Sequence, residues 1–171
     1  MTYVHSFAPV ADDQARVLIL GSMPGRLSLE RQQYYAHPRN AFWPLMGALF
    51  GATPELDYAA RLQRLQAQHV AVWDVLKLCT REGSLDSAIV ESSIECNDFA
   101  ALFARSPQIG QVFFNGAKAA ATYQRYVAPV LATPQIRFHR LPSTSPAHAS
   151  LDLPAKLNAW RVVKDAVLLD L

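Results

Sequence analysis

The fold is decided by the stretch VLILGSMPGRLSLERQQYYAHPRNAFWPLMGAL, which covers residues 17–49. Residues 17–20 form a short aliphatic run that is typical of a buried strand. The run ends at Gly21-Ser22-Met23-Pro24-Gly25, where two glycines and a proline predict a tight turn. A polar and aromatic loop extends to Asn40, and the apolar run Phe42–Phe50 then predicts a helix. In α/β proteins such a loop after a strand is a common ligand site, so this loop is our first candidate.

The composition predicts one globular domain that covers residues 1–171. The chain is 51% hydrophobic and 18% charged, which gives enough apolar surface for a core. It has no apolar run long enough for a membrane span and no signal-peptide pattern, so we expect a cytoplasmic protein and, by default, a monomer. Cys79 and Cys96 are expected to be thiols. No pair of histidines has metal-ligand spacing, so we expect no metal and no cofactor.

The basic residues favour an anionic partner because of where they lie. The net charge is only +2, but arginines outnumber lysines by twelve to four. Arg26, Arg31 and Arg39 all fall in the loop described above. The planar guanidinium group binds two phosphate oxygens at once, although any single arginine is more often a solvated surface charge.

Strand and helix patterns alternate along the rest of the chain. Further strands are predicted over residues 69–76, 111–114 and 136–141, and further helices over 58–68, 99–105, 117–127 and 155–169. Residues 1–16 are expected to form an edge segment, and residues 80–93 a polar loop. Four rounds of this alternation predict a parallel sheet with helices on both faces.

Polar residues follow the ends of the four predicted strands. They are the loop 21–40, Asp74, Asn115 and the run 142–148. Parallel strands end at one edge of a sheet, so we expect these four segments to share one cleft.

Each of these polar residues has a structural and a functional interpretation. Asn40 is placed to cap the following helix, and its amide could instead orient a water nucleophile. Asp74 is either a satisfied core carboxylate or a group that binds the edge of a heterocycle. Tyr34 and Tyr35 are either core aromatics or a stacking platform for a flat ligand. Residues 142–146 (PSTSP) are either a rigid linker or a loop that holds phosphates through outward-facing backbone N–H groups.

Three motifs in these segments form a recognisable set. They are residues 21–25 (GSMPG), residues 35–43 (YAHPRNAFW) and residues 141–147 (LPSTSPA). They resemble the uracil-DNA glycosylase superfamily, and more closely its hypoxanthine-DNA (deoxyinosine) glycosylase branch, family 6. The likeness spans nearly the whole chain. It implies a three-layer α/β/α sandwich around a four-stranded parallel sheet, and a substrate of double- or single-stranded DNA that contains a deaminated base.

The resemblance also implies roles for individual residues. Asn40 would be catalytic and would position a water below C1′ of a nucleotide that is extruded from the DNA. The base would stack on Tyr35, and its edge would be read by Asp74, with Asn115 as a further substrate-binding residue. The other substrate-binding residues that it implies are Gly21, Ser22, Met23, Pro24 and His37, and the DNA-binding residues are Arg39, Ser143, Ser145, Pro146, Ala147 and His148. Residues 146–148 would press into the gap in the duplex. No lysine lies in these motifs, which argues against Schiff-base lyase chemistry.

Two positions depart from the superfamily pattern. Met23 stands where many members hold the attacking water with Asp or Asn, and Leu141 stands where uracil-specific members have a histidine. Both departures weigh against strong uracil activity. The alternatives are a uracil or G:U mismatch glycosylase, a DNA- or nucleotide-binding relative without catalysis, and a nucleoside hydrolase.

Overall fold

Four parallel strands form the central sheet of the computed structural model, which describes residues 2–169. Met1 and residues 170–171 of the expected 1–171 domain lie outside the described residues. The strands are β2 (Val17–Gly21), β3 (Val70–Asp74), β6 (Gln111–Asn115) and β7 (Arg137–Leu141), in the order β3-β2-β6-β7. Every residue of β2 and β3 is buried, which explains their continuous apolar sequences. The predicted four-stranded parallel sheet is confirmed.

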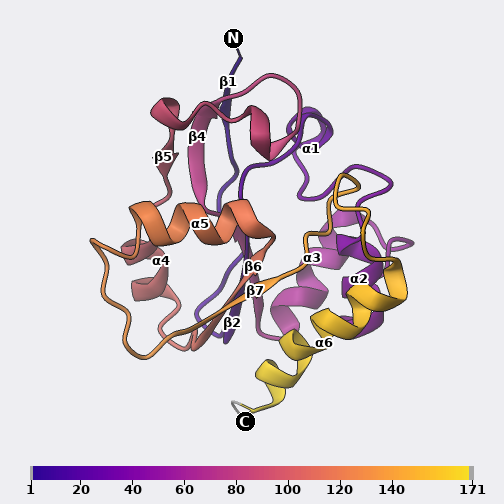
Figure 1. Cartoon of the computed structure of the whole chain (residues 1–171). Helices are drawn as coiled ribbons and strands as arrows, with labels where there is room; N and C mark the ends of the chain where they lie inside the picture. The colour runs from indigo at the N-terminus through magenta and orange to yellow at the C-terminus, as the bar shows by residue number, and fades with distance from the viewer. Residues whose placement is uncertain (1, 170–171) are drawn as a thin grey trace.

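Helices cover both faces of this sheet (Figure 1). One face carries α2 (Phe42–Phe50), α3 (Tyr58–Ala67) and α6 (Leu153–Leu169), and the other carries α4 (Phe99–Arg105) and α5 (Ala117–Tyr126). Trp160 of α6 packs edge-on against Phe42 of α2, with 6.4 Å between the ring centroids. On the opposite face, Tyr123 of α5 packs against Phe114 of β6. The three-layer α/β/α sandwich is therefore confirmed.

A second, antiparallel sheet lies beyond the carboxyl ends of the parallel strands (Figure 1). It contains β1 (Tyr3–His5), β4 (Leu76–Thr80) and β5 (Glu95–Cys96), in the order β1-β4-β5. The single strand predicted over 69–76 is therefore wrong at its end. Val75 turns the chain, with its N–H donating to the Gly21 carbonyl at 2.8 Å, and Leu76 begins the second sheet. Apolar residues continue across this turn, so the sequence shows no break there.

The loops also contain short helices. The segment predicted as a continuous loop between Gly25 and Asn40 holds α1 (Arg26–Arg31), in which leucines alternate with polar residues and give no clear helical period. The polar segment 80–93 holds two short 3-10 helices, η1 (Asp86–Ala88) and η2 (Glu91–Ser93). Within residues 2–169, the helices are all too short or too polar to cross a membrane.

Candidate active site

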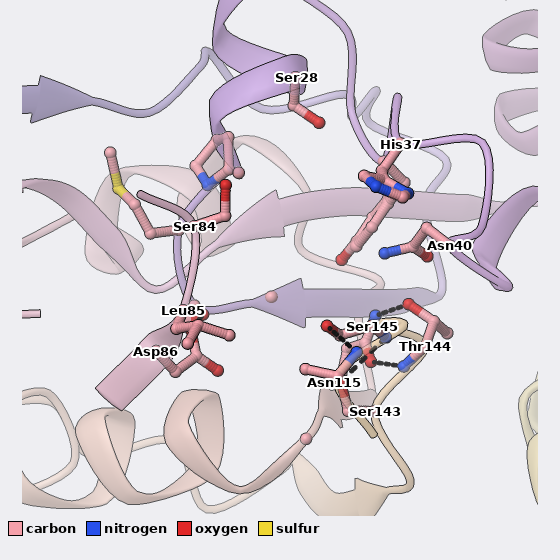
Figure 2. A pocket seen from close by; sticks show the side chains of 18 of the residues that line it. Ser28, His37, Asn40, Ser84, Leu85, Asp86, Asn115, Ser143, Thr144 and Ser145 are labelled. Carbon is pink, nitrogen blue, oxygen red and sulfur yellow. Dashed lines mark hydrogen bonds between the residues drawn. The ribbon is translucent and has the colours of Figure 1, made fainter. Parts of the chain in front are cut away.

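The carboxyl ends of the parallel strands open into a cleft of about 820 Å³ (Figure 2). Its walls come from residues 21–28, 34–40, 84–87, 115–118 and 143–148, together with Asp74. Every residue predicted above to bind substrate or DNA lines this cleft. The topology brings these distant segments together because all four strands point the same way.

The floor of the cleft is built around Gly21. A Cβ atom at this position would lie 2.5 Å from Oδ1 of Asp74 and 2.8 Å from Oη of Tyr35. Both contacts are too close for any side chain larger than hydrogen. Gly21 therefore lets a carboxyl group and a phenol converge on the same point of the floor.

Both converging groups carry a buried oxygen atom that is left without a partner. Within residues 2–169, neither Oδ2 of Asp74 nor Oη of Tyr35 makes a hydrogen bond. Buried polar atoms are nearly always hydrogen-bonded in folded proteins, because an unpaired one costs about 1–3 kcal/mol. Two such atoms, on groups that converge at Gly21 in the floor of a cleft, indicate a site that is completed by a ligand.

The carboxyl group of Asp74 can act as either a donor or an acceptor near neutral pH. Burial raises the pKa of Asp74 to about 7, and the carboxylate of Asp86 adds to the rise, whereas the guanidinium of Arg81 opposes it. The ordinary pKa of an aspartate is 3.8. A ligand atom of either hydrogen-bonding type can thus be bound at this position.

Tyr35 has a strained backbone conformation, and its ring stacks on a neighbouring aromatic ring. Its φ of 54° lies in the left-handed region, which non-glycine residues occupy at a cost and mostly at functional sites. One face of the ring stacks on Phe42, with 4.0 Å between centroids and 13° between planes. Burial, followed by the charge of Asp74, raises the pKa of Tyr35, so its phenol stays protonated and can donate.

The structure confirms the capping contact that the position of Asn40 predicted, and it leaves the amide nitrogen of Asn40 available to the cleft. Its Oδ1 accepts a hydrogen bond from the N–H of Phe42 at 2.9 Å and so satisfies the start of α2, although Ala41 is the N-cap residue itself. Within the described part of the chain, no group accepts a hydrogen bond from the side-chain Nδ2. Figure 2 shows this nitrogen turned away from α2 and into the cleft. The amide is held rigidly by one end and free at the other.

Asn115 is more restricted than the sequence suggested, because it forms a reciprocal pair with Thr144. Its Nδ2 donates to Oγ1 of Thr144, and its Oδ1 accepts from the Thr144 backbone N–H, both at 2.9 Å. The Asn115 side chain also acts on the Tyr35 phenol and opposes the rise in the pKa of Tyr35. The carbonyl of Thr144 also accepts from the N–H of Ala41 at 3.0 Å. The fully buried Thr144 therefore joins β6, the 142–148 loop and the Asn40 segment, a role that its place in a Ser/Pro run did not indicate.

The 142–148 loop uses its polar groups internally, which differs from the expected outward-facing N–H groups. The N–H of Ser145 donates to Oγ of Ser143 at 3.1 Å, and the N–H of Ala147 donates to Oγ of Ser145 at 3.2 Å. Nζ of the buried Lys156 donates to the carbonyl of His148 at 2.8 Å. The loop is thereby stiffened, with Pro146 and Ala147 exposed at its tip.

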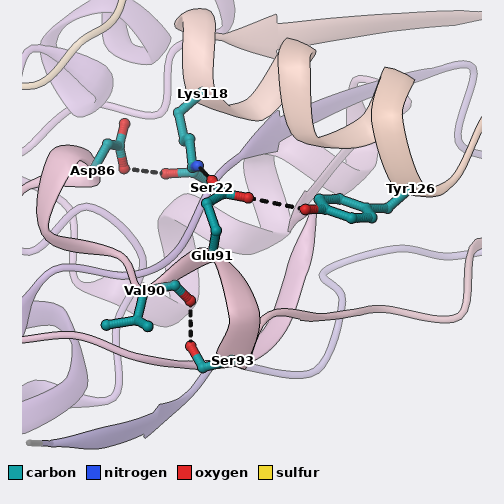
Figure 3. Close-up of polar contacts among 7 residues, drawn as sticks. All are labelled: Ser22, Asp86, Val90, Glu91, Ser93, Lys118 and Tyr126. Carbon is teal, nitrogen blue, oxygen red and sulfur yellow. Dashed lines mark hydrogen bonds and ion pairs between the residues drawn. The ribbon is translucent and has the colours of Figure 1, made fainter.

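The remaining wall consists of residues 84–87 and is supported by other residues of the 81–91 segment, where sequence patterns indicated no function. The buried guanidinium of Arg81 donates to the carbonyls of Pro24 (2.6 Å) and Gly83 (3.0 Å). Ser22 donates to Oδ1 of Asp86 at 2.5 Å (Figure 3). Lys118, at the start of α5, pairs with Glu91, which also accepts from Tyr126 (Figure 3). These contacts depend on the turn after β3, which the sequence did not reveal.

The two positions that depart from the superfamily pattern are apolar in the structure as well. The largely buried Met23 packs in a small core with Leu76, Cys79 and Ile89. Leu141 is also buried and pairs with Asn115 across β6 and β7. In residues 2–169, histidine, cysteine and acidic residues form no group that could hold a metal ion.

Comparisons with known proteins agree on one family. The family described as the uracil DNA glycosylase superfamily matches residues 8–164. A protein of Methanosarcina barkeri named hypoxanthine DNA glycosylase is 41% identical over 66% of this chain and 70% of its own length. A protein of Methanosarcina acetivorans with the same name is 40% identical, over 66% and 71%.

A solved structure extends this likeness to the complete fold. The solution NMR structure of a candidate uracil DNA glycosylase from Methanosarcina acetivorans is 32% identical, with a TM-score of 0.79. The match covers 98% of this chain and 99% of the other. The chain therefore belongs to the uracil DNA glycosylase superfamily.

Proposed function

We propose that the protein is a monofunctional DNA glycosylase that removes hypoxanthine from deoxyinosine in DNA and leaves an abasic site. The observation that carries this proposal is the pair of unpartnered buried oxygens of Asp74 and Tyr35 on the cleft floor. Two relatives named hypoxanthine DNA glycosylase support the choice of base. The base lies inside the duplex, so it must be extruded into the cleft before reaction.

Hypoxanthine matches the floor through its lactam edge, where N1–H is a donor and the adjacent O6 an acceptor. A carboxylate at Asp74 accepts from N1–H, and a carboxylic acid at the same position also donates to O6. The pKa of about 7 allows this acid form near neutral pH. Negative charge develops on O6 as the base departs, so a proton at Asp74 supplies stabilisation that Leu141 cannot.

The remaining groups place the base and the water. One face of the Tyr35 ring is covered by Phe42, which leaves the other for the extruded base. Nδ2 of Asn40 holds the oxygen of a water below C1′. An amide is a poor base, so the C1′–N9 bond must be largely broken before the water attacks. The bonding electron pair leaves with the base, the water oxygen joins C1′, and its proton passes to solvent.

The cleft rim provides the DNA contacts in this proposal. Arg39 is exposed beside Asn40, and His148 lies on the opposite loop. Guanidinium and hydroxyl groups bind phosphate oxygens without reading the sequence. The side chains proposed to follow the backbone are those of Arg39, Ser143, Ser145, Pro146, Ala147 and His148.

Asn40→Ala is the direct test of this mechanism. We expect single-turnover base release from deoxyinosine to fall about 100-fold or more, because the water loses its positioning group, with DNA affinity nearly unchanged. Asn40→Asp keeps the acceptor for the Phe42 N–H, so it separates loss of chemistry from loss of the helix cap. Asn158→Ala, on the exposed side of α6, is a matched control and should leave release unchanged.

The same assay with deoxyuridine or deoxyxanthosine in place of deoxyinosine shows which base the protein releases. Release from deoxyuridine alone would contradict the proposal and favour a uracil glycosylase. Binding without release from any of the three would favour a relative that lacks catalysis.

A further inference from the structure

The first turn of α6 carries a buried charge that the mechanism above does not use. Lys156 is only 5% exposed, and its Nζ donates to the carbonyl of His148 at 2.8 Å. Among residues 2–169, no carboxylate forms an ion pair with Lys156. Asp152, just before α6, instead uses its carboxylate to accept from the N–H of Ala155 at 3.0 Å. Lysines are almost never buried unless they are paired, so this ammonium group requires an explanation.

Anchoring the loop does not by itself explain the charge. Helix α6 holds both ends of the 142–148 loop, because Nε1 of Trp160, one turn after Lys156, donates to the carbonyl of Pro142 at 2.9 Å. Trp160 is fully buried and neutral, and it makes the same kind of hydrogen bond as Lys156. A neutral donor is therefore sufficient to hold one end of the loop, and the positive charge at the His148 end indicates a further role.

The surroundings of Lys156 favour an anion on the other side of the loop. The amino end of a helix carries partial positive charge, and a cation in the first turn of α6 adds to it. Burial lowers the pKa of Lys156, so the charged form has a cost in the free protein that a nearby anion reduces. His148 lines the cleft, where the DNA backbone is proposed to run. A charge inside the protein is screened by salt much less than a charge in water.

On the basis of the proposed function, we propose that Lys156 is a positioning residue that fixes the 142–148 loop and supplies, from beneath it, a positive charge that attracts the DNA phosphates. The charge acts through the His148 segment and without touching the phosphate, because the side chain is buried. It raises the affinity for DNA of any sequence and takes no part in breaking the glycosidic bond.

The test measures the affinity of the full chain for a fluorescently labelled duplex by anisotropy, between about 50 and 200 mM salt. Lys156→Gln keeps a hydrogen-bond donor and removes the charge. We expect it to weaken binding about tenfold at low salt and to lower the slope of log Kd against log salt by about one, equally for deoxyinosine and undamaged duplexes. Lys164→Gln, at an exposed lysine of the same helix, is the matched control and should leave the slope unchanged. A wild-type slope for Lys156→Gln, or an equal fall for Lys164→Gln, would overturn the proposal.

Further variants separate the charge from the anchor. Lys156→Met removes both charge and donor at nearly the same length and should lower the slope as much as Lys156→Gln does, so it also decides the question if the glutamine variant does not fold. Lys156→Arg keeps the charge and should keep most of the slope. In single-turnover release from deoxyinosine, the effect of Lys156→Gln should appear in the protein concentration that gives half the maximal rate. A fall in the maximal rate alone would overturn the proposal. If the wild-type protein releases no base, the proposed function fails, and the salt dependence on undamaged DNA still decides the role of Lys156.

Discussion

On the floor of the cleft, Asp74 and Tyr35 keep buried oxygens without partners, whereas the 142–148 loop at the rim satisfies its polar groups internally. The floor therefore carries a cost in the free protein that a ligand can remove, and the loop carries none. The difference indicates that recognition is concentrated on the floor, and that the loop contributes a rigid shape. It also predicts that substitutions on the floor lower activity and raise stability. Substitutions around the loop should mainly lower stability.

The largest effect is expected for Asp74→Leu. A leucine has nearly the same size but cannot bind the base edge, so base release should fall about 100-fold or more in single-turnover assays. The same change removes a buried unpaired carboxyl group and should raise the free energy of unfolding by about 1–3 kcal/mol in urea titrations. A variant that is both inactive and less stable would show that the carboxyl group has a structural partner in solution.

The raised pKa of Asp74 gives a second prediction, on the pH dependence of stability. The pKa is about 7 in the folded protein against an ordinary 3.8, so the folded state holds the proton over this range and the unfolded state does not. Stability is therefore greatest below pH 4 for this group and falls as pH rises towards 7, in total by on the order of 4 kcal/mol.

Thermal unfolding between pH 4 and 8 checks this prediction, with Asp74→Asn as the matched variant that cannot titrate. The variant should lose most of the decline that the wild-type protein shows. The charge of Asp86 contributes to the raised pKa of Asp74, so Asp86→Asn should make the decline smaller and end it at a lower pH. Parallel curves for wild type and Asp74→Asn would contradict the assignment.

The sequence predicted the central sheet and the convergence of its loops because both follow from local patterns. Apolar runs mark β2 and β3, and the polar residues after them mark where each strand ends. The second sheet was missed because apolar residues continue through Val75 and Leu76, so two strands read as one. The wall of residues 84–87 and its supporting residue Arg81 depend on that turn and were missed with it.

The hydrogen-bond partner of a side chain was predictable only where the two residues are close together in the sequence. The capping contact of Asn40 with Phe42 spans two residues and was expected from position. The pair of Asn115 and Thr144 spans twenty-nine residues, and the sequence suggested a free amide instead. Long-range pairs of this kind are set by the packing of the whole sheet edge, for which short patterns carry no signal.

The smallest effect is expected for Thr144→Val, which tests the rim side of the comparison. Valine keeps the shape and the backbone bonds to Asn115 and Ala41 but removes the Oγ1 that accepts from the Asn115 amide. The buried amide N–H loses its partner, so the protein should be destabilised by about 1 kcal/mol, which lowers Tm by roughly 2–4 °C. Thr144→Ser, which keeps the oxygen, should recover most of this loss. Base release should change only a few-fold, because the floor is untouched. A loss of activity as large as that of Asp74→Leu, without a matching loss of stability, would mean that recognition extends from the floor to the rim.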